Sequence, residues 1–110
     1  MNTNFFQIEQ DTAWQPADTK IERQVYGYSD DVMMVKVRFE KGGIGTMHQH
    51  PHTQVTYVES GAFEMTIGDE KRIIRKGDGY FVPPNILHGC VCLEAGMLID
   101  CFTPKRADFL

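Results

Sequence analysis

The stretch Gly42–Gly61 reads GGIGTMHQHPHTQVTYVESG and holds three of the chain's four histidines within five positions. In an extended strand successive side chains alternate between two faces, so His48, His50 and Gln54 share a face and are expected to point into one cavity. The fourth histidine, His88, must reach this cavity from a distant strand. Because neutral imidazole suits divalent transition metals, we predict that Gly42–Gly61 forms half of a metal site.

Short strand-like runs separated by glycine turns make up the chain on both sides of this stretch. No segment keeps a helical hydrophobic period over about 11 residues. The clearest alternation spans Val32–Glu40, where apolar positions fall on one face and charged positions on the other. The apolar set is Met33, Val35, Val37 and Phe39. About eight short strands at this turn spacing predict an all-β fold, a small barrel or jelly roll with residues 1–110 as one domain.

Three local features of this fold are also expected. Ser60-Gly61-Ala62 should form a hairpin turn between Val55–Glu59 and Phe63–Ile67, because glycine adopts the positive φ that a tight reversal requires. Residues 1–19 should be irregular, since aspartates and a proline interrupt any strand pattern there. The charged C-terminal run Lys105–Leu110 should pack loosely or against a partner.

Composition and charge exclude several functions. A net charge of −4 with singly scattered basic residues offers no footprint for nucleic acid or an anionic membrane. No apolar run approaches the roughly 20 residues that cross a bilayer, and the N-terminus lacks the pattern of a secretion signal, so we expect a soluble cytoplasmic protein. Cys90, Cys92 and Cys101 are expected to be reduced thiols, because Cys90 and Cys92 are too close in one strand to bridge comfortably.

Asp100 interrupts the otherwise apolar run Met97–Phe102. Burying a carboxylate there costs several kcal/mol unless the group is paired or protonated. One interpretation is a structural aspartate that is hydrogen-bonded to its surroundings. The other is a general acid or base that faces the metal cavity, with Phe102 on the same face two residues later.

The order of these residues resembles the two motifs of the cupin family. The first, G-x5-H-x-H-x3-E-x6-G, maps with its spacing kept onto Gly42, His48, His50, Gln54 and Gly61. The second, G-x5-P-x-G-x2-H-x3-N, maps onto Gly77, Pro83 and His88, with Asn85 and Cys92 at the remaining glycine and asparagine positions. The resemblance implies a cupin jelly-roll barrel and one divalent metal ion bound by His48, His50, Gln54 and His88. His52 lies off this spacing, so we expect it to contact the substrate or orient a ligand.

Gln54 stands where the cupin motif usually has a glutamate. Three neutral imidazoles and a neutral amide leave the full charge on a divalent ion, whereas a glutamate would cancel one unit of it. Such a centre favours anion binding and Lewis-acid chemistry over the dioxygenase chemistry of many cupins. The alternative is that the amide simply replaces the carboxylate as a ligand and dioxygenase activity survives. The ligands do not select one metal among nickel, zinc, iron, manganese and cobalt, because histidine and glutamine side chains can bind each of them.

Further stretches resemble the pectin-degradation cupins of the KdgF family, over nearly the whole chain. They are Met33-Met34-Val35, residues 38–42, Pro83-Pro84-Asn85, residues 89–96, and residues 98–100 with Phe102. This resemblance implies conversion of 4,5-unsaturated monouronates, released from pectin or alginate, into the linear ketonised 4-deoxy-5-keto-uronate. It also implies that Asp100 and Phe102 lie against the sugar, Asp100 as a proton carrier. Small cupins usually pair, and edge strands near the N-terminus have no other cover, so we expect a homodimer.

This chemistry suits the residues and needs no organic cofactor. A 4,5-unsaturated uronate carries a carboxylate conjugated to an enol ether, so moving a proton to C4 builds negative charge that a dipositive metal stabilises. Two rival classes stay open. One is a non-catalytic cupin that binds sugar acids and needs the cavity but not Asp100, and the other is a metal-dependent lyase or dioxygenase that acts on another small acid.

Overall fold

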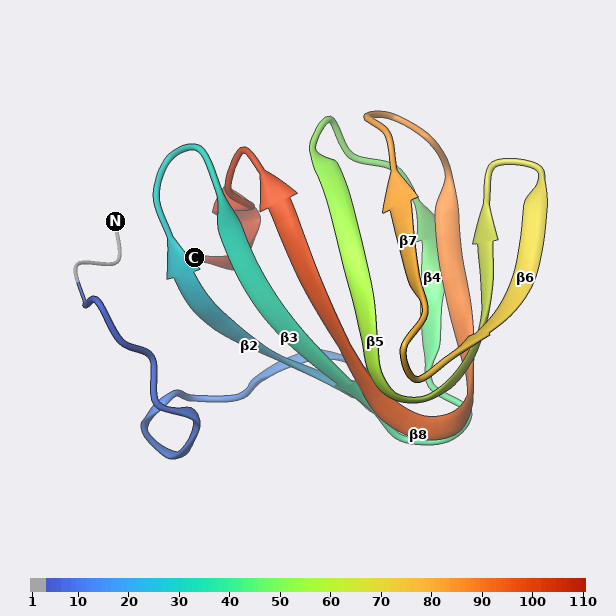
Figure 1. Ribbon diagram of the computed structural model, residues 1–110, viewed down its shortest axis with the longest axis horizontal. Helices are drawn as coiled ribbons and strands as arrows, with labels where there is room; N and C mark the ends of the chain where they lie inside the picture. The colour runs from blue at the N-terminus through green and yellow to red at the C-terminus, as the bar shows by residue number, and fades with distance from the viewer. Residues whose placement is uncertain (1–3) are drawn as a thin grey trace.

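Two long strands, β5 (Thr53–Ile67) and β8 (His88–Thr103), form the axis of the fold. They pair antiparallel from end to end. Both strands bend near their middle, so that the sheet is folded into two halves that face one another (Figure 1). The computed structural model describes residues 4–110. Residues 1–3, which belong to the segment expected to be irregular, lie outside the described residues.

The other strands attach to these two. In the first half-sheet β3 (Met33–Phe39) pairs with the C-terminal half of β8. Next to it, β2 (Ile21–Tyr28) pairs with β3, and β1 (Gln15–Asp18) pairs with β2 at the edge. On the other side, β7 (Gly79–Val82) pairs with the N-terminal half of β5. In the second half-sheet β4 (Ile44–His48) pairs with the N-terminal half of β8 and β6 (Glu70–Arg75) with the C-terminal half of β5. Two 3₁₀ turns, η1 (Glu9–Asp11) and η2 (Ala107–Phe109), complete the described chain. The predicted all-β fold is confirmed.

Alternation along β3 buries its apolar side chains, as predicted. Met33 and Val35 are fully buried and Phe39 is 7% exposed, while Met34 points outward. Phe39 meets Phe63 of the second half-sheet edge-on, with ring centroids 5.1 Å apart. Burying a side chain of this size contributes about 1.5–3 kcal/mol, so this contact helps to hold the two half-sheets together.

The predicted hairpin at Ser60-Gly61-Ala62 is wrong, because β5 continues through these residues as one strand that bends without reversing. Its pairing with β8 continues on both sides, and the register shifts at this point. Gly61 has a φ of +83°, and a Cβ there would lie 2.6 Å from the carbonyl oxygen of Glu94. The positive φ therefore belongs to a β-bulge at which two bent strands approach closely, a feature that needs glycine as much as a tight turn does.

The N-terminal segment is more ordered than expected. Residues 15–18 form the edge strand β1, in which Gln15 pairs with Arg23 of β2. An edge strand tolerates Pro16, since one side of its backbone needs no ladder partner. Upstream, the fully buried Gln24 donates from Nε2 to the carbonyl oxygens of Glu9 at 3.0 Å and Thr12 at 2.8 Å, which fixes η1 against the sheet.

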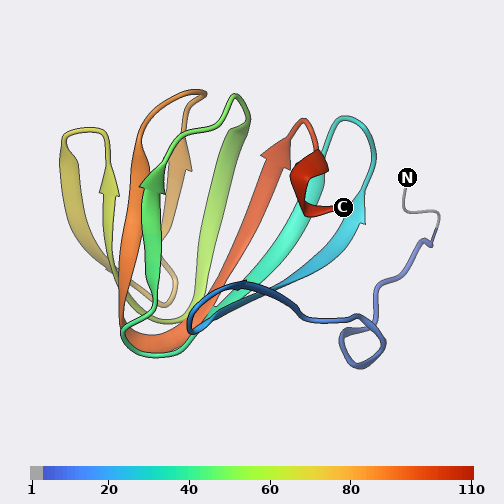
Figure 2. The same cartoon turned by 180° about the vertical axis from the view of Figure 1, so that it is seen from behind.

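The C-terminal run also departs from the prediction of loose packing. Lys105 donates from Nζ to Oδ1 of Asp30 at 2.7 Å, and the side chain of Arg106 is only 12% exposed. Seen from behind, η2 lies on the inner side of the first half-sheet beside the ends of β8 and β3 (Figure 2). The end of the chain therefore lies against the inner face of the folded sheet, where Arg106 and Phe109 line a cavity.

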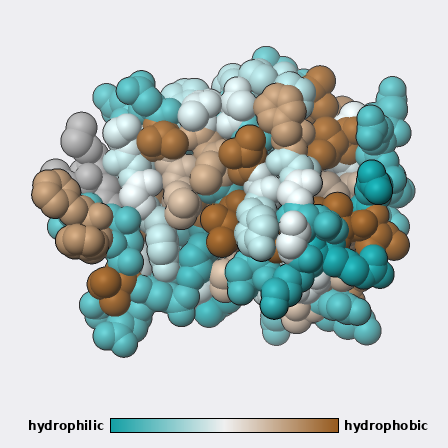
Figure 3. Space-filling model, in the orientation of Figure 1, coloured by the Kyte–Doolittle hydropathy of each residue, from teal (hydrophilic) through white to brown (hydrophobic). Residues whose placement is uncertain are grey.

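A band of apolar side chains crosses the outer face of the first half-sheet. From strand to neighbouring strand its members are Met34, Cys101, Val55 and Phe81, which we call the outer apolar band. Met34, Val55 and Phe81 are 41%, 49% and 57% exposed. Figure 3 shows apolar side chains near the middle of this side of the molecule. Among residues 4–110 no helix has the length and apolar character to span a membrane.

Candidate metal centre

Three histidine side chains meet at one place in the barrel. His48 ends β4, His88 begins β8 and the two are register partners, while His50 lies in the connection from β4 to β5. The ring centroid of His88 lies 4.4 Å from that of His48 and 4.8 Å from that of His50. Their possible ligand nitrogens all lie within 4.8 Å of one another. The structure thus brings the predicted histidines together.

The reason for this meeting differs from the one predicted. Alternation along a single extended strand was expected to align His48, His50 and Gln54. In the structure β4 ends at His48 and β5 starts only at Thr53, so the three residues come from a strand end, a connection and the next strand. Pairing of β4 and β5 with the shared strand β8 brings them together instead.

Backbone carbonyls fix the tautomer of each histidine. The Nδ1 atoms of His48, His50 and His88 lie 2.8, 3.2 and 2.9 Å from carbonyl oxygens of Thr46, His52 and Ile86. A carbonyl only accepts, so each Nδ1 carries the proton and each neutral ring presents the Nε2 lone pair. Burial lowers the pKa of His50, and it lowers that of His88 to about 4. Burial therefore favours the neutral imidazole at His50 and His88, the form that binds metals.

Gln54 turns its amide oxygen towards this cluster. Its Nε2 donates to Oγ1 of Thr56 at 3.0 Å and to Oδ1 of Asp100 at 3.4 Å, so its Oε1 faces Nε2 of His50 at 3.0 Å. With the His50 proton on Nδ1, the two facing atoms are both acceptors, an arrangement that a shared cation satisfies. Two ligand atoms bound at right angles with bonds of about 2.1 Å lie about 3 Å apart.

The buried Nε2 of His88 also bears on whether these residues can hold a metal ion. It has no hydrogen-bond partner within the described part of the chain. An unprotonated nitrogen left without a donor inside a protein is unfavourable unless a ligand occupies it. The donor set of three imidazole nitrogens and one amide oxygen therefore fits a divalent transition metal ion, and it carries no negative charge of its own.

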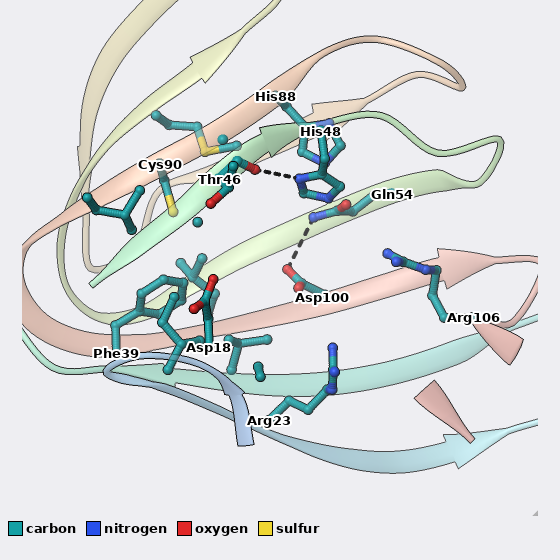
Figure 4. Close-up of a pocket in the computed structure, with 18 of the residues that line it drawn as sticks. Asp18, Arg23, Phe39, Thr46, His48, Gln54, His88, Cys90, Asp100 and Arg106 are labelled. Atoms are coloured by element: carbon teal, nitrogen blue, oxygen red, sulfur yellow. Dashed lines mark hydrogen bonds between the residues drawn. The ribbon is translucent and has the colours of Figure 1, made fainter. Parts of the chain in front are cut away.

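Asp100 lies directly behind the amide of Gln54. It is 8% exposed, and its Oδ1 accepts a hydrogen bond of 2.7 Å from Oγ1 of its register partner Thr56. Burial raises the pKa of Asp100 to about 6, although the Thr56 bond and the charge of Arg106 oppose this shift. Figure 4 shows Asp100 and Gln54 pointing towards one another below His48 and His88. The side chain of Asp100 is hydrogen-bonded and also lines the cavity, which is the position that each of the two interpretations requires.

Phe102 and His52 are placed differently. Phe102 is 2% exposed, lines the cavity and meets the ring of His50 edge-on with centroids 5.8 Å apart. His52 turns its ring towards the C-terminal run, where its Nε2 lies 3.2 Å from the carbonyl oxygen of Lys105. Its carbonyl holds Nδ1 of His50, so it orients a ligand through its backbone.

A cavity of about 300 Å³ adjoins the histidines and contains two arginines that the sequence did not indicate. Arg106 lies over the rings of Phe102 and Phe109, with its Cζ 5.1 and 4.3 Å from their centroids. Arg23 enters from β2. Thr56 was also missed, although it shares the inward parity of Gln54 on the same strand.

The chain is similar to cupins along most of its length. The profile of the cupin domain matches residues 35–99. The pectin degradation protein KdgF of Dickeya dadantii (strain 3937) is 50% identical over 105 residues, which cover 94% of this chain and 96% of that protein. The structure of KdgF from Halomonas sp. is 40% identical with a TM-score of 0.93, covering 98% of this chain and 100% of that chain. An RmlC-like cupin from Shewanella frigidimarina NCIMB 400 is 37% identical with a TM-score of 0.95, covering 98% and 97%.

Proposed function

Because this chain belongs to the cupin family and to its KdgF members, we propose that it acts in pectin breakdown as an isomerase-type enzyme. Its substrate is a 4,5-unsaturated monouronate derived from pectin or alginate, and its product is the linear 4-deoxy-5-keto-uronate. The observation that carries the proposal is the placement of a buried carboxylate, Asp100, one hydrogen bond away from the amide of Gln54 in the metal-site cavity.

His48, His50, His88 and Gln54 would hold one divalent ion. Because these ligands are all neutral, the ion when bound would keep its full positive charge and would supply electrostatic stabilisation for the enolate that forms during the reaction. The chemistry is a balanced isomerisation. The proton of the anomeric hydroxyl leaves, the bond between C1 and the ring oxygen breaks, and a carbonyl forms at C1. The resulting enolate takes up a proton at C4 to give the ketone at C5.

Protein groups move the proton and position the sugar. Asp100 takes the proton from the anomeric hydroxyl and delivers it to C4, and no redox step is involved. Thr56 holds the Asp100 carboxylate in one orientation through its 2.7 Å hydrogen bond. Phe102 presents an apolar surface against the sugar ring, two residues further along β8 on the same side.

A time course by NMR tests this proposal. The protein loaded with zinc, nickel or manganese is mixed with an unsaturated monouronate, and the C4 proton signals are compared with those of a sample without protein. Faster loss of the vinyl proton together with new C4 methylene signals supports the proposal. Saturable binding without this conversion would instead identify a sugar-acid-binding cupin, and oxygen consumption in the same mixture would identify a dioxygenase.

Two further properties belong to the proposal. All three cysteines are free, which suits action in the reducing cytoplasm. A second copy of the chain would cover the outer apolar band, because a two-fold contact lets one such surface bury itself against its equivalent.

A further inference from the structure

Arg23, the second of the two arginines that line the cavity, has no role in the reaction proposed above. Arg23 lies on β2, paired with Gln15 of β1 and Val37 of β3, and its side chain reaches the cavity. Figure 4 shows it across the cavity from His48 and His88.

The Arg23 guanidinium has unused donors. Within residues 4–110 it makes no hydrogen bond or ion pair, and its Nε is buried without a partner. The other arginine of the cavity, Arg106, is already engaged, since it donates to both carboxylate oxygens of Asp108 at 3.0 and 2.8 Å. Burial lowers the pKa of Arg23, and the charge of Arg106 lowers it further. A partly desolvated cation with free donors gains most from an anionic ligand.

Phe109 holds this guanidinium in position. The Cζ of Arg23 lies 3.9 Å from the centroid of the Phe109 ring. Stacking on a ring uses the flat face of a guanidinium and leaves its in-plane N–H groups free. Two of those groups match the two oxygens of a carboxylate.

We propose that Arg23 is a specificity-determining residue that binds the anionic group of the ligand and so selects uronates over neutral sugars. The choice of a uronate rests on the proposed function. Binding itself does not depend on turnover, so it is measured with saturated sugars, which lack the 4,5 double bond that the reaction requires.

The test compares D-galacturonate with D-galactose, which share a ring but differ in charge. Dissociation constants are measured by calorimetry on the zinc-loaded protein, on Arg23→Gln and on Arg38→Gln. Arg38 is a matched control, because its Cζ also lies 3.9 Å from an aromatic centroid, that of Trp14, but its side chain pairs with Glu22 away from this cavity. We expect Arg23→Gln to lower the preference for the acid about tenfold or more and Arg38→Gln to leave it unchanged.

A second measurement uses the wild-type protein alone and is independent of how the variant folds. The Arg23 Nε–H resonance should shift when galacturonate is added and stay in place with galactose. Three results would overturn the inference: equal binding of both sugars by the wild type, an unchanged preference in Arg23→Gln, or an equal loss of both sugars, which would mean that Arg23 only supports Phe109. If the preference depends on Arg23 but the unsaturated uronate is not converted, the proposed function fails and this inference stands.

Discussion

Oγ1 of Thr56 donates a 2.7 Å hydrogen bond to Oδ1 of Asp100, its register partner on the neighbouring strand. The same hydroxyl accepts the amide N–H of Gln54 at 3.0 Å. One hydrogen-bonded chain therefore links the amide that faces His50 to the buried carboxylate. Asp100 supplies none of the four candidate ligand atoms, so its chemistry is separable from metal binding.

We expect Asp100→Asn to slow ketonisation about a hundredfold or more, the scale of a lost general acid–base. The asparagine Oδ1 can still accept from Thr56 and Gln54, so metal content should not change. Stability should hold or rise, because a buried carboxylate without a cationic partner is removed. NMR turnover, metal analysis and urea unfolding measure the three effects. Asp69→Asn, in the exposed turn between β5 and β6, is the control, and normal turnover by Asp100→Asn would assign Asp100 a structural role only.

Gln54→Glu should bind metal more tightly yet turn over at least about tenfold more slowly. The added carboxylate would cancel part of the metal charge, and it would replace the N–H that now lies 3.4 Å from Asp100 with a like charge. Competition against a chelator measures affinity, and NMR measures turnover. Unchanged turnover would show that the uncancelled charge is not required, and oxygen uptake by this variant would favour the dioxygenase alternative.

Metal should stabilise the folded chain in a concentration-dependent way. A ligand that binds only the native state at a hundred times its Kd contributes about 2.7 kcal/mol, so melting temperature should rise with added metal and fall with a chelator. His88→Ala should lose this response, because it removes a buried ligand nitrogen. His52→Ala is the control, since its ring faces Lys105 and it should respond like the wild type. A metal response retained by His88→Ala would contradict the site.

Gly61→Ala should destabilise the fold by about 2 kcal/mol or more. The substitution adds strain at a positive φ and places a Cβ 2.6 Å from backbone oxygen of Glu94. Gly77→Ala separates these effects, because Gly77 also has a positive φ but no atom within 4 Å of the added Cβ. Urea unfolding of both variants measures the difference, and equal losses would mean that the close approach of β5 and β8 is unimportant.

The outer apolar band should bury itself in a homodimer. Light scattering at about tens of micromolar should give twice the mass of one chain, and Phe81→Glu, which charges a side chain that is 57% exposed, should shift the equilibrium to monomer. Ile73→Glu, on β6 outside the band, is the matched control. A monomeric wild-type protein would rule out this assembly.

The residues of the candidate metal site could be predicted because their spacing is carried by the sequence itself. His48, His50, Gln54 and His88 keep fixed separations, and Asp100 was visible as a charge within an apolar strand. The bulge at Gly61 could not be told from a hairpin, since glycine permits the same backbone in both.

The arginines of the cavity lacked any such signal. Arg106 follows the last strand, where no alternation of apolar and polar residues indicates which way a side chain points. Contacts with distant residues, such as the hydrogen bond from Lys105 to Asp30, hold this run in place. Arg23 lies in β2 between Glu22 and Gln24, so three polar residues in a row hide which face is buried. Contacts between distant segments decide both positions, and a single sequence does not record them.

The sharing of β8 between both half-sheets has a consequence for synthesis on the ribosome. His48 finds its register partner at His88, and Gln54 pairs with both Val82 and Phe102, so the candidate metal site closes only through contacts between distant parts of the chain. Such long-range closures form late and slowly in folding. A nascent chain that has not yet released β8 has two of the three candidate histidine ligands and the amide of Gln54 but lacks His88. The full set of candidate ligands is therefore assembled only after almost the whole domain has left the exit tunnel.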